Sequence, residues 1–422
     1  MKYLVNIAFL ALFFVFSGCG GSSLDEPQKV AFKDGELIAD FPANLIKEDL
    51  LKKGLIDKNT TVFGFRAYKL SYTTKDDEGK ELNASGVIIV PSDLTLNQED
   101  KAKLEQMKAI GLSIVVDNHG TVFANKEAPS VLIANTMMPE GSGVIYSSLA
   151  GFITLQADYI GFGDSKEHYH PYLLKNSSAN AVVDFYKKAL EFLSENNIAK
   201  VNSGIFLSGY SQGGYVTLAA LKKFEEEHIA VNIATPMAGP YLLDPIAQSV
   251  LSLEEIAIPS FMAAVAHSYA TLYKQDITSL IQEPYASKLS RLFDSKEYTR
   301  EEIDKELTTK VKGENGLFSD EIVQNYQGSW FQNALKANSV VDFAPQTPVK
   351  LIQCKGDSVV PYAISEASQN IFANYFDTEV DLIPVEDTLG LANYLDHVAC
   401  AKYAYMIANN IFVEYRKATI GY

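Results

Sequence analysis

The sequence predicts an α/β fold in which helices flank a mostly parallel central sheet. Apolar segments of strand length alternate with helical patterns from residue 112 to residue 234, which is typical of right-handed βαβ units. The same alternation resumes from residue 349 to residue 415, so the sheet is expected to continue there. The chain has 422 residues and is 47% hydrophobic, which is ample for a sizeable core.

The first residues are interpreted as an export signal. Lys2 precedes an apolar run over residues 3–16 that is too short to span a bilayer. The small residues before Cys19 resemble the bacterial lipoprotein processing box, which implies cleavage before Cys19, a lipid anchor on it and attachment to the outer membrane of the cell envelope. The alternative is an ordinary signal peptide and a soluble periplasmic or secreted protein.

A tether and a hairpin are expected next. Residues 24–60 are mixed and polar and predict a tether followed by short helical turns. Residues 62–73 and 84–90 flank a charged turn, which predicts an antiparallel hairpin at the sheet edge. The patterns that follow predict helices over 98–110, 143–149 and 179–193, and strands over 112–116, 152–157, 203–207 and 229–234.

Residues 241–343 have helical patterns without strand-like alternation. Because so long a loop is uncommon, they predict a helical cap inserted before the penultimate strand. Five of its aromatic residues are candidates for an acyl pocket: Phe261, Tyr269, Tyr273, Trp330 and Phe331. Most of these five are expected to be ordinary core residues instead. A strand over 349–353, a helix over 363–375, a strand over 380–385 and a helix over 398–415 complete the core. The expected divisions are 1–18 (signal peptide), 19–45 (tether), 46–240 (first part of the core), 241–345 (cap) and 346–422 (second part of the core).

The chain is organised around one Gly-x-Ser-x-Gly run over residues 209–213. An apolar strand precedes it and a helical pattern follows, which is the setting of the nucleophile elbow of α/β-hydrolases. The glycines let the backbone turn sharply and expose Ser211 as the candidate nucleophile. The backbone N–H of Gln212 would then face a developing oxyanion.

A serine nucleophile needs a base and an orienting acid, which follow it in the order acid, then histidine, in α/β-hydrolases. Of the histidines after Ser211, His228 ends the next helix and His267 lies within the cap, so His397, after the last strand, is the candidate base. The candidate acid is Asp357, directly after the penultimate strand. Its rivals Asp381 and Glu386 lie on the wrong strand or too close to His397.

The segment after the strand over 112–116 supplies the second oxyanion donor. His119-Gly120 stands where α/β-hydrolases place it, so the backbone N–H of Thr121 is the candidate. His119 precedes the nucleophile and is expected to be structural rather than the base. Asp158 and Asp164 also lie upstream of Ser211 and are expected to cap turns.

Several segments resemble the secretory lipase family, over a span from Val62 to the C-terminus. They are Tyr68–Thr74, Ala84–Pro91, Ala157–Gly161, Gly209–Gly214, Asn338-Ser339 with Pro345 and Pro348, and the Gly356-Asp357 and His397 segments in matching order. The resemblance implies an α/β-hydrolase fold that acts on small-molecule or lipid carboxylic esters, acylglycerols among them.

Two other activities compete with ester hydrolysis. A serine peptidase on the same fold would need a site for a charged peptide terminus, and the sequence points to no acidic pair for one. A non-catalytic binding lipoprotein would not need all three triad positions filled.

The remaining composition bounds partners and cofactors. With 36 Lys and Arg against 52 Asp and Glu, no basic surplus exists to bind nucleic acid. Three cysteines and six histidines show no metal-ligand spacing, and no cofactor is expected. Cys354 and Cys400 flank the candidate acid and base, so they form either a disulfide or two buried thiols. The sequence does not predict the oligomeric state.

Overall fold

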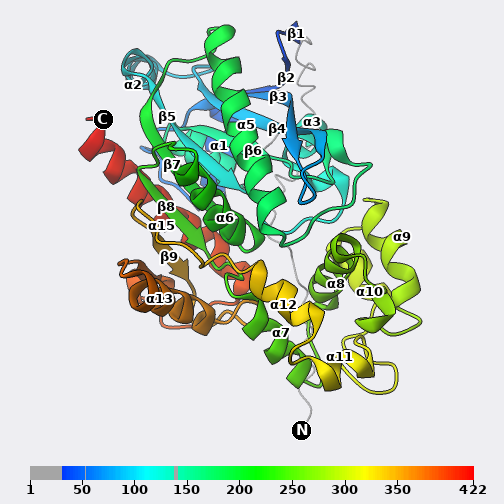
Figure 1. Cartoon of the computed structure of the whole chain (residues 1–422). Coiled ribbons are helices and arrows are strands. Elements are labelled where there is room, and N and C mark those ends of the chain that lie inside the picture. Colours follow the sequence, from blue (N-terminus) through cyan, green and yellow to red (C-terminus); the bar gives the residue numbers. More distant parts are fainter. Residues whose placement is uncertain (1–30, 53, 137–140) are drawn as a thin grey trace.

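The computed structural model describes residues 31–52, 54–136 and 141–422. A ten-stranded sheet runs through this part of the chain in the order β1-β2-β3-β4-β6-β5-β7-β8-β9-β10 (Figure 1). Its strands are β1 (Ala31–Phe32), β2 (Gly35–Phe41), β3 (Gly64–Lys75), β4 (Glu81–Ser92), β5 (Leu112–Asn118), β6 (Ile153–Ala157), β7 (Val201–Tyr210), β8 (Ile233–Met237), β9 (Lys350–Gln353) and β10 (Asp381–Pro384).

The sheet is antiparallel at one side and parallel over the rest. Strands β1 to β4 pair antiparallel with one another, and β4 pairs antiparallel with β6. From β6 through β5, β7, β8 and β9 to β10 every pairing is parallel. The predicted mostly parallel sheet is confirmed. Because parallel strands end at the same edge, the segments that follow β5, β7 and β9 come together there.

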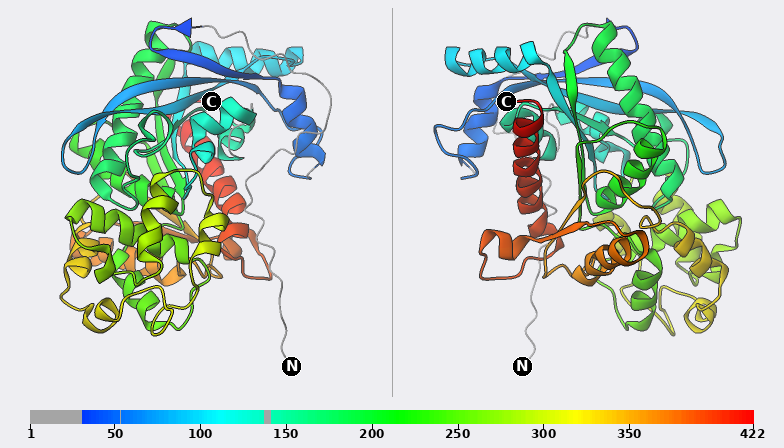
Figure 2. Two further views of the ribbon diagram at one scale, coloured as in Figure 1. Left: turned by 90° about the vertical axis from the view of Figure 1, so that its right-hand side faces the viewer. Right: turned by 60° about the vertical axis from the view of Figure 1, so that its left-hand side comes forward.

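Alternate residues of the central strands face two different layers of helices. Leu207 of β7 packs into the cluster with α5 (Lys175–Glu195) and α6 (Gln212–Glu226), whereas Phe206 packs with Phe412 of α15 (His397–Thr419). This period of two places a helical layer on each face of the sheet, as Figure 2 shows for α15 on one side and α5 on the other. The remaining core helices are α1 (Ala43–Lys52), α2 (Gln98–Ile110), α3 (Pro129–Thr136), α4 (Gly141–Gly143), α13 (Tyr362–Phe376) and α14 (Val385–Leu389).

Six α-helices lie between β8 and β9 in the chain, beside one end of the sheet (Figures 1 and 2). Tyr269, Leu292 and Phe331 are among the side chains that they bury. The six are α7 (Leu243–Ser252), α8 (Pro259–Tyr273), α9 (Leu289–Asp294), α10 (Arg300–Glu306), α11 (Asp320–Asn325) and α12 (Trp330–Ala337). We refer to residues 241–345 as the helical insert.

Two sequence-based assignments differ from the structure. Residues 35–41 were expected in a tether or helical turns but form β2, which pairs with β3 through Leu37 and Phe41. As an outer strand of the sheet, β2 keeps most of its side chains half-buried, and it mixes apolar residues with the charged Glu36 and Asp40. The strand expected over 229–234 is instead β8, which begins later and continues through Pro236.

The predicted signal peptide, Cys19 and residues 19–30 of the tether lie outside the described residues. In the part of the chain that the structure describes, no helix is long and apolar enough to cross a membrane.

Candidate active site

Ser211 lies on a sharp turn between β7 and α6. Its backbone adopts φ 59° and ψ −121°, a conformation that residues with a Cβ rarely take. The neighbouring strand holds the turn in place, because the Ser211 N–H donates to the Met237 carbonyl at 2.9 Å. Such strain persists only where the surroundings enforce it, and it presents the hydroxyl at the end of the strand.

The two glycines of the elbow are required by close backbone contacts. A Cβ added to Gly213 would lie 1.9 Å from the Asn118 carbonyl oxygen, and one added to Gly209 would lie 2.4 Å from the carbonyl oxygen of Gly213. No side chain fits at either distance. The elbow is therefore packed directly against the end of β5.

The three predicted triad side chains are brought together. His397 Nε2 lies 2.9 Å from Ser211 Oγ, and His397 Nδ1 lies 2.6 Å from Asp357 Oδ2. An ionised carboxylate can only accept, so Nδ1 carries a proton and Nε2 accepts from the serine hydroxyl. This is the arrangement in which an imidazole can act as a base toward Ser211.

Asp357 is held by its own loop. Its Oδ1 accepts the backbone N–H groups of Val359 and Val360 at 2.9 Å each, and its Oδ2 accepts from Gln353 Nε2 at 3.0 Å. The carboxylate is buried, and with His397 it has four donors. The Asp357 side chain is therefore fixed before any substrate arrives.

His397 is placed by the start of α15. Asp396 caps this helix by accepting from the Ala399 N–H at 2.8 Å, so His397 occupies the first helical position. From β7, the Tyr210 hydroxyl donates to the His397 carbonyl at 2.6 Å, and the two rings lie 5.0 Å apart. Tyr210, the residue before the candidate nucleophile, thus holds the backbone of the candidate base.

The two predicted oxyanion donors lie on adjoining segments. Gln212 is the first residue of α6, where the backbone N–H has no partner within the helix. Thr121 follows Gly120, which lies close to the end of β7, because a Cβ added to Gly120 would be 3.4 Å from the Tyr210 carbonyl oxygen. The Thr121 hydroxyl bonds to the Tyr172 hydroxyl at 2.8 Å, which anchors this loop.

His119 is fully buried beneath this loop. Its Nδ1 bonds to the Gly120 carbonyl at 2.7 Å, and its ring stacks on Tyr159 with centroids 4.0 Å apart. Burial lowers the pKa of His119 to about 4, so the imidazole is neutral at neutral pH. Its environment is that of a structural residue.

Asp158 and Asp164 do more than cap turns. Asp158 is fully buried and accepts from the hydroxyls of Ser85 and Ser130 and from the Ser130 N–H, which joins β4 to α3. Asp164 instead pairs with Lys69 and the Ser71 hydroxyl, both of β3. The expected turn-capping roles miss these long-range contacts.

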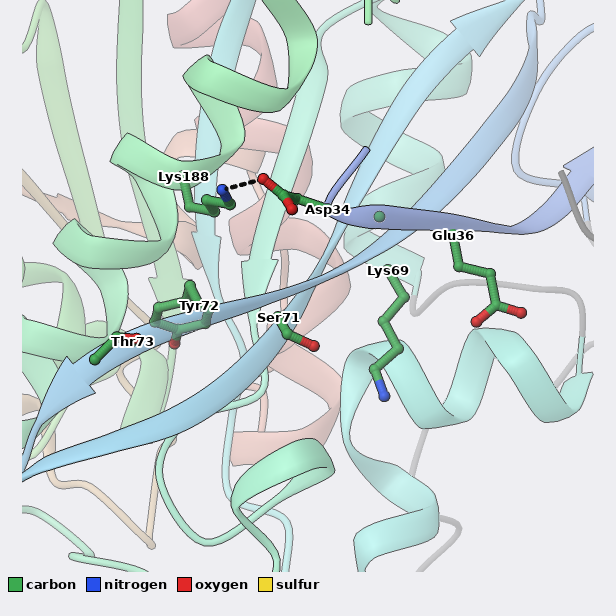
Figure 3. Close-up of a pocket in the computed structure, with 8 residues that line it drawn as sticks. Asp34, Glu36, Lys69, Ser71, Tyr72, Thr73 and Lys188 are labelled. Carbon is green, nitrogen blue, oxygen red and sulfur yellow. Dashed lines mark hydrogen bonds and ion pairs between the residues drawn. The ribbon is translucent and has the colours of Figure 1, made fainter. Parts of the chain in front are cut away.

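The groove that Lys69 and Ser71 help to line has a volume of about 550 Å³ and lies over β2, β3 and α5 (Figure 3). Both lysines that line it are already paired, Lys188 with Asp34 at 2.9 Å and Lys69 with Asp164. None of the triad residues lines it. The groove is therefore separate from the site around Ser211.

The other histidines do not join the triad. His267 Nε2 lies 2.9 Å from Asp294 Oδ1 within the helical insert, and His228 follows the end of α6. His170 was not singled out from the sequence, yet its Nε2 lies 3.1 Å from Gln212 Nε2 while its Nδ1 bonds to the Ile160 carbonyl. Burial lowers its pKa to about 3, so neutral His170 accepts from the Gln212 amide.

The aromatic residues of the helical insert mostly pack on one another. The Tyr273 ring stacks with that of Tyr269 and lies at a tilt beside Trp330. Phe331 contacts both Tyr269 and Trp330. Tyr269 and Phe331 are buried in the core of the insert, whereas Trp330 is half-buried and Tyr273 is exposed. Phe261 differs, because it contacts Phe123, two residues beyond the candidate oxyanion donor Thr121.

Cys354 and Cys400 form a disulfide in the structure. It joins the segment before Asp357 to α15. Among residues 31–52, 54–136 and 141–422, no group of three or more His, Cys, Asp or Glu side chains is placed to hold a metal ion.

Comparison with known proteins relates the chain to hydrolases. Residues 142–388 match the family model described as secretory lipase. The fold resembles a putative hydrolase of Legionella pneumophila, with 22% identity and a TM-score of 0.77 over 93% of this chain and 99% of that chain. It also resembles the ligand-bound rice cell wall degrading esterase LipA of Xanthomonas oryzae (21%, TM-score 0.71, 93% and 98%) and Candida antarctica lipase A (13%, TM-score 0.56, 88% and 78%).

At these identities the structural likeness establishes the α/β-hydrolase fold alone. No curated protein matches the sequence significantly.

Proposed function

The chain belongs to the secretory lipase family, and from this premise we propose that it is a serine carboxylic ester hydrolase with Ser211 as its nucleophile. The observation that carries the proposal is the hydrogen-bonded chain from Ser211 through His397 to Asp357. The family model supports a lipase- or esterase-like hydrolase, and the elbow geometry supports the choice of nucleophile.

In the proposed reaction, His397 Nε2 takes the Ser211 proton as Oγ attacks the ester carbonyl carbon. The tetrahedral intermediate collapses when the imidazolium gives this proton to the leaving alkoxide, which departs as the alcohol. Water then attacks the acyl-enzyme with His397 again as the base, and the acid product leaves. Asp357 stabilises the imidazolium through its 2.6 Å hydrogen bond in both halves of the cycle.

The oxyanion of both tetrahedral intermediates would be bound by the backbone N–H groups of Gln212 and Thr121. Donors of this kind each contribute roughly 2.7–4 kcal/mol to transition-state stabilisation. The position of Gln212 at the start of α6 adds the positive end of the helix dipole. The bond between Thr121 and Tyr172 supports a fixed donor on the other side.

The substrate class is a small-molecule or lipid ester, and the helical insert serves as a cap beside the site. The named relatives include an esterase that degrades rice cell walls and a lipase, so both polar and acylglycerol esters are candidates. Membership of a secretory family indicates an exported protein. The small residues before Cys19 support a lipid anchor in the cell envelope.

The proposal is tested with p-nitrophenyl esters of increasing acyl length, for wild type, Ser211→Ala and the matched control Ser203→Ala. Ser203 lies on the same strand, β7, but is exposed. We expect Ser211→Ala to lose on the order of 10³-fold or more in kcat, because the acyl-enzyme cannot form, and Ser203→Ala to retain wild-type turnover. Wild type that is as inert as Ser211→Ala toward every ester would refute ester hydrolysis. The acyl-length profile separates a small-ester esterase from a lipase.

A further inference from the structure

Glu386 is a buried carboxylate next to the triad that the proposed reaction does not use. It lies at the start of α14 with 1% of its surface exposed. Its Oε2 accepts the Lys355 N–H at 2.9 Å, and its Oε1 accepts the N–H groups of Leu395 at 3.0 Å and of Gly356 at 3.4 Å. All three donors are backbone amides.

These amides belong to two separate loops. Lys355 and Gly356 directly precede Asp357, and Leu395 lies two residues before His397. The loops touch at the same place, because a Cβ added to Gly356 would lie 2.7 Å from the Leu395 carbonyl oxygen. A single carboxylate thus binds the loop of the acid to the loop of the base.

The charge of Glu386 strengthens this connection. Burial by itself would raise the pKa of the carboxyl, but the amides of Leu395, Lys355 and Gly356 lower it, and the net pKa lies below its usual range. Glu386 is therefore ionised at neutral pH. Hydrogen bonds to an ionised acceptor are roughly twice as strong as neutral ones, and a buried charge that loses its donors is costly.

We propose that Glu386 is a positioning residue that sets the 2.6 Å separation between Asp357 Oδ2 and His397 Nδ1. The inference rests on the proposed function, because it assumes that this pair acts in catalysis. The Cys354–Cys400 disulfide instead joins the residue before Lys355 to α15, three residues beyond His397. Glu386 alone among these connections bonds to the residue that immediately precedes Asp357.

The structure offers a matched control on the same helix. Asp387 is the neighbour of Glu386 and pairs with Lys355 Nζ at 2.6 Å, but its side chain is 56% exposed. Surface ion pairs of this kind contribute little. Asp387→Asn removes one carboxylate charge beside the same loop without touching the three backbone amides.

The test compares ester hydrolysis by wild type, Glu386→Gln, Glu386→Asp and Asp387→Asn over pH 5 to 9. In Glu386→Gln one carboxylate oxygen becomes an amide donor that faces a backbone N–H, so the two loops separate. A misplacement on the order of 1 Å costs roughly 10²-fold in rate. We expect kcat of Glu386→Gln to fall at least about tenfold with KM nearly unchanged, and kcat of Asp387→Asn to stay within about twofold.

The pH profile separates positioning from a general loss of structure. The His397 imidazolium faces Asp357, Ser211 and the Tyr210 ring, with Asp396 next to it in the chain. If Asp357 is held less firmly, the His397 imidazolium loses part of its stabilisation. The acid limb of the kcat/KM profile should therefore move to lower pH in Glu386→Gln. A smaller fraction of folded protein would instead lower kcat/KM at every pH without shifting the profile along the pH axis. Turnover is expressed per active serine, titrated with a phosphonylating probe.

The outcomes distinguish the two proposals. If wild type hydrolyses esters and Ser211→Ala does not, but Glu386→Gln behaves as Asp387→Asn does, the positioning role is wrong and the proposed function stands. A rise in KM with an unmoved pH profile also overturns the positioning role. If Glu386→Gln does not fold, the same readings are taken on Glu386→Asp, whose shorter side chain keeps the charge but reaches fewer amides. Inert wild type would refute the proposed function itself.

Discussion

His397 Nε2 lies 2.9 Å from the Oγ of Ser211, although the two residues are 186 positions apart in the sequence. A second contact lies beside the first, because Tyr210, directly before the candidate nucleophile, donates its hydroxyl to the His397 carbonyl. The end of β7 and the start of α15 are thus joined by two hydrogen bonds, one from a side chain to a backbone carbonyl and one between side chains. Ser211 and His397 are therefore both held at the end of β7.

Replacing Asp357, the candidate acid, should leave His397 in place but impair its ability to accept the Ser211 proton. In Asp357→Asn, the amide Nδ2 can donate to His397 Nδ1, which favours the tautomer that carries its proton on Nε2 and cannot accept from Ser211. We expect kcat to fall by on the order of 10³–10⁴-fold, measured on the ester that wild type hydrolyses best.

Asp381→Asn is the control for this substitution. Asp381 is one of the two rival acids in the sequence, but it is exposed on β10 and pairs with Lys350. Its replacement should change kcat by less than about twofold, since exposed ion pairs contribute little. Equal losses in the two variants would contradict the assignment of Asp357.

Gly213 should not tolerate any side chain. The Cβ of Gly213→Ala would lie 1.9 Å from the Asn118 carbonyl oxygen, so either the elbow or the loop that carries Thr121 must move. We expect a loss of about 3 kcal/mol or more in the free energy of unfolding, and a loss of roughly 10²-fold in kcat. Urea unfolding and ester hydrolysis measure the two effects.

Gly313→Ala separates crowding from backbone strain. Gly313 has a positive φ of 72°, but an added Cβ would meet nothing within 4 Å. Alanine there costs only about 1–2 kcal/mol for the left-handed conformation, and ester turnover should be unchanged. A Gly213→Ala protein as active as Gly313→Ala would show that the elbow is not packed as described.

The disulfide should contribute to stability through the loop that it closes. Cys354 and Cys400 are 46 positions apart, and linking them restricts the unfolded chain by an amount worth about 2–4 kcal/mol. The double variant Cys354→Ala/Cys400→Ala should therefore unfold at lower urea concentration than wild type. A reductant should lower the stability of wild type but leave the variant unchanged. A peptide map under non-reducing conditions that finds both thiols free would contradict the bond.

The strand, turn and helix around Ser211 were predictable because the chemistry of the elbow is local. Gly209 and Gly213 are required by contacts within a few residues and with the adjoining strand, so the motif carries its own structural signature. Asp357 and His397 could be chosen by their order after Ser211, since the parallel sheet brings the ends of successive strands to one edge. The positions of Asp357 and His397 follow from the order of strands and helices, which the spacing of apolar residues in the sequence indicates.

Residues whose role depends on contacts distant in sequence were missed or misjudged. Glu386 was set aside as a rival acid because it is near His397, and no local pattern shows that it accepts amides from two loops. His170 bears no motif, although its ring is bonded to Gln212. The strand β2 lies in a stretch of mixed charged and apolar residues, and its pairing with β3 is a contact distant in sequence that no local pattern shows.

The last prediction concerns the pH dependence of stability at His119. Burial lowers its pKa to about 4, whereas in the unfolded chain it titrates near 6.5. Between these values the unfolded state binds a proton that the folded state does not, so stability falls as pH drops from about 6.5 to about 4. The contribution lost amounts to about 3 kcal/mol.

In His119→Gln this loss of stability is absent, because the variant has no imidazole to bind the proton. The difference in free energy of unfolding between wild type and His119→Gln should therefore be constant above about pH 7.5 and shift by about 3 kcal/mol toward the variant by pH 4, as measured by urea unfolding across this range. A difference that does not vary with pH would mean that His119 binds its proton equally well in both states, and that it is accessible to solvent in the folded protein.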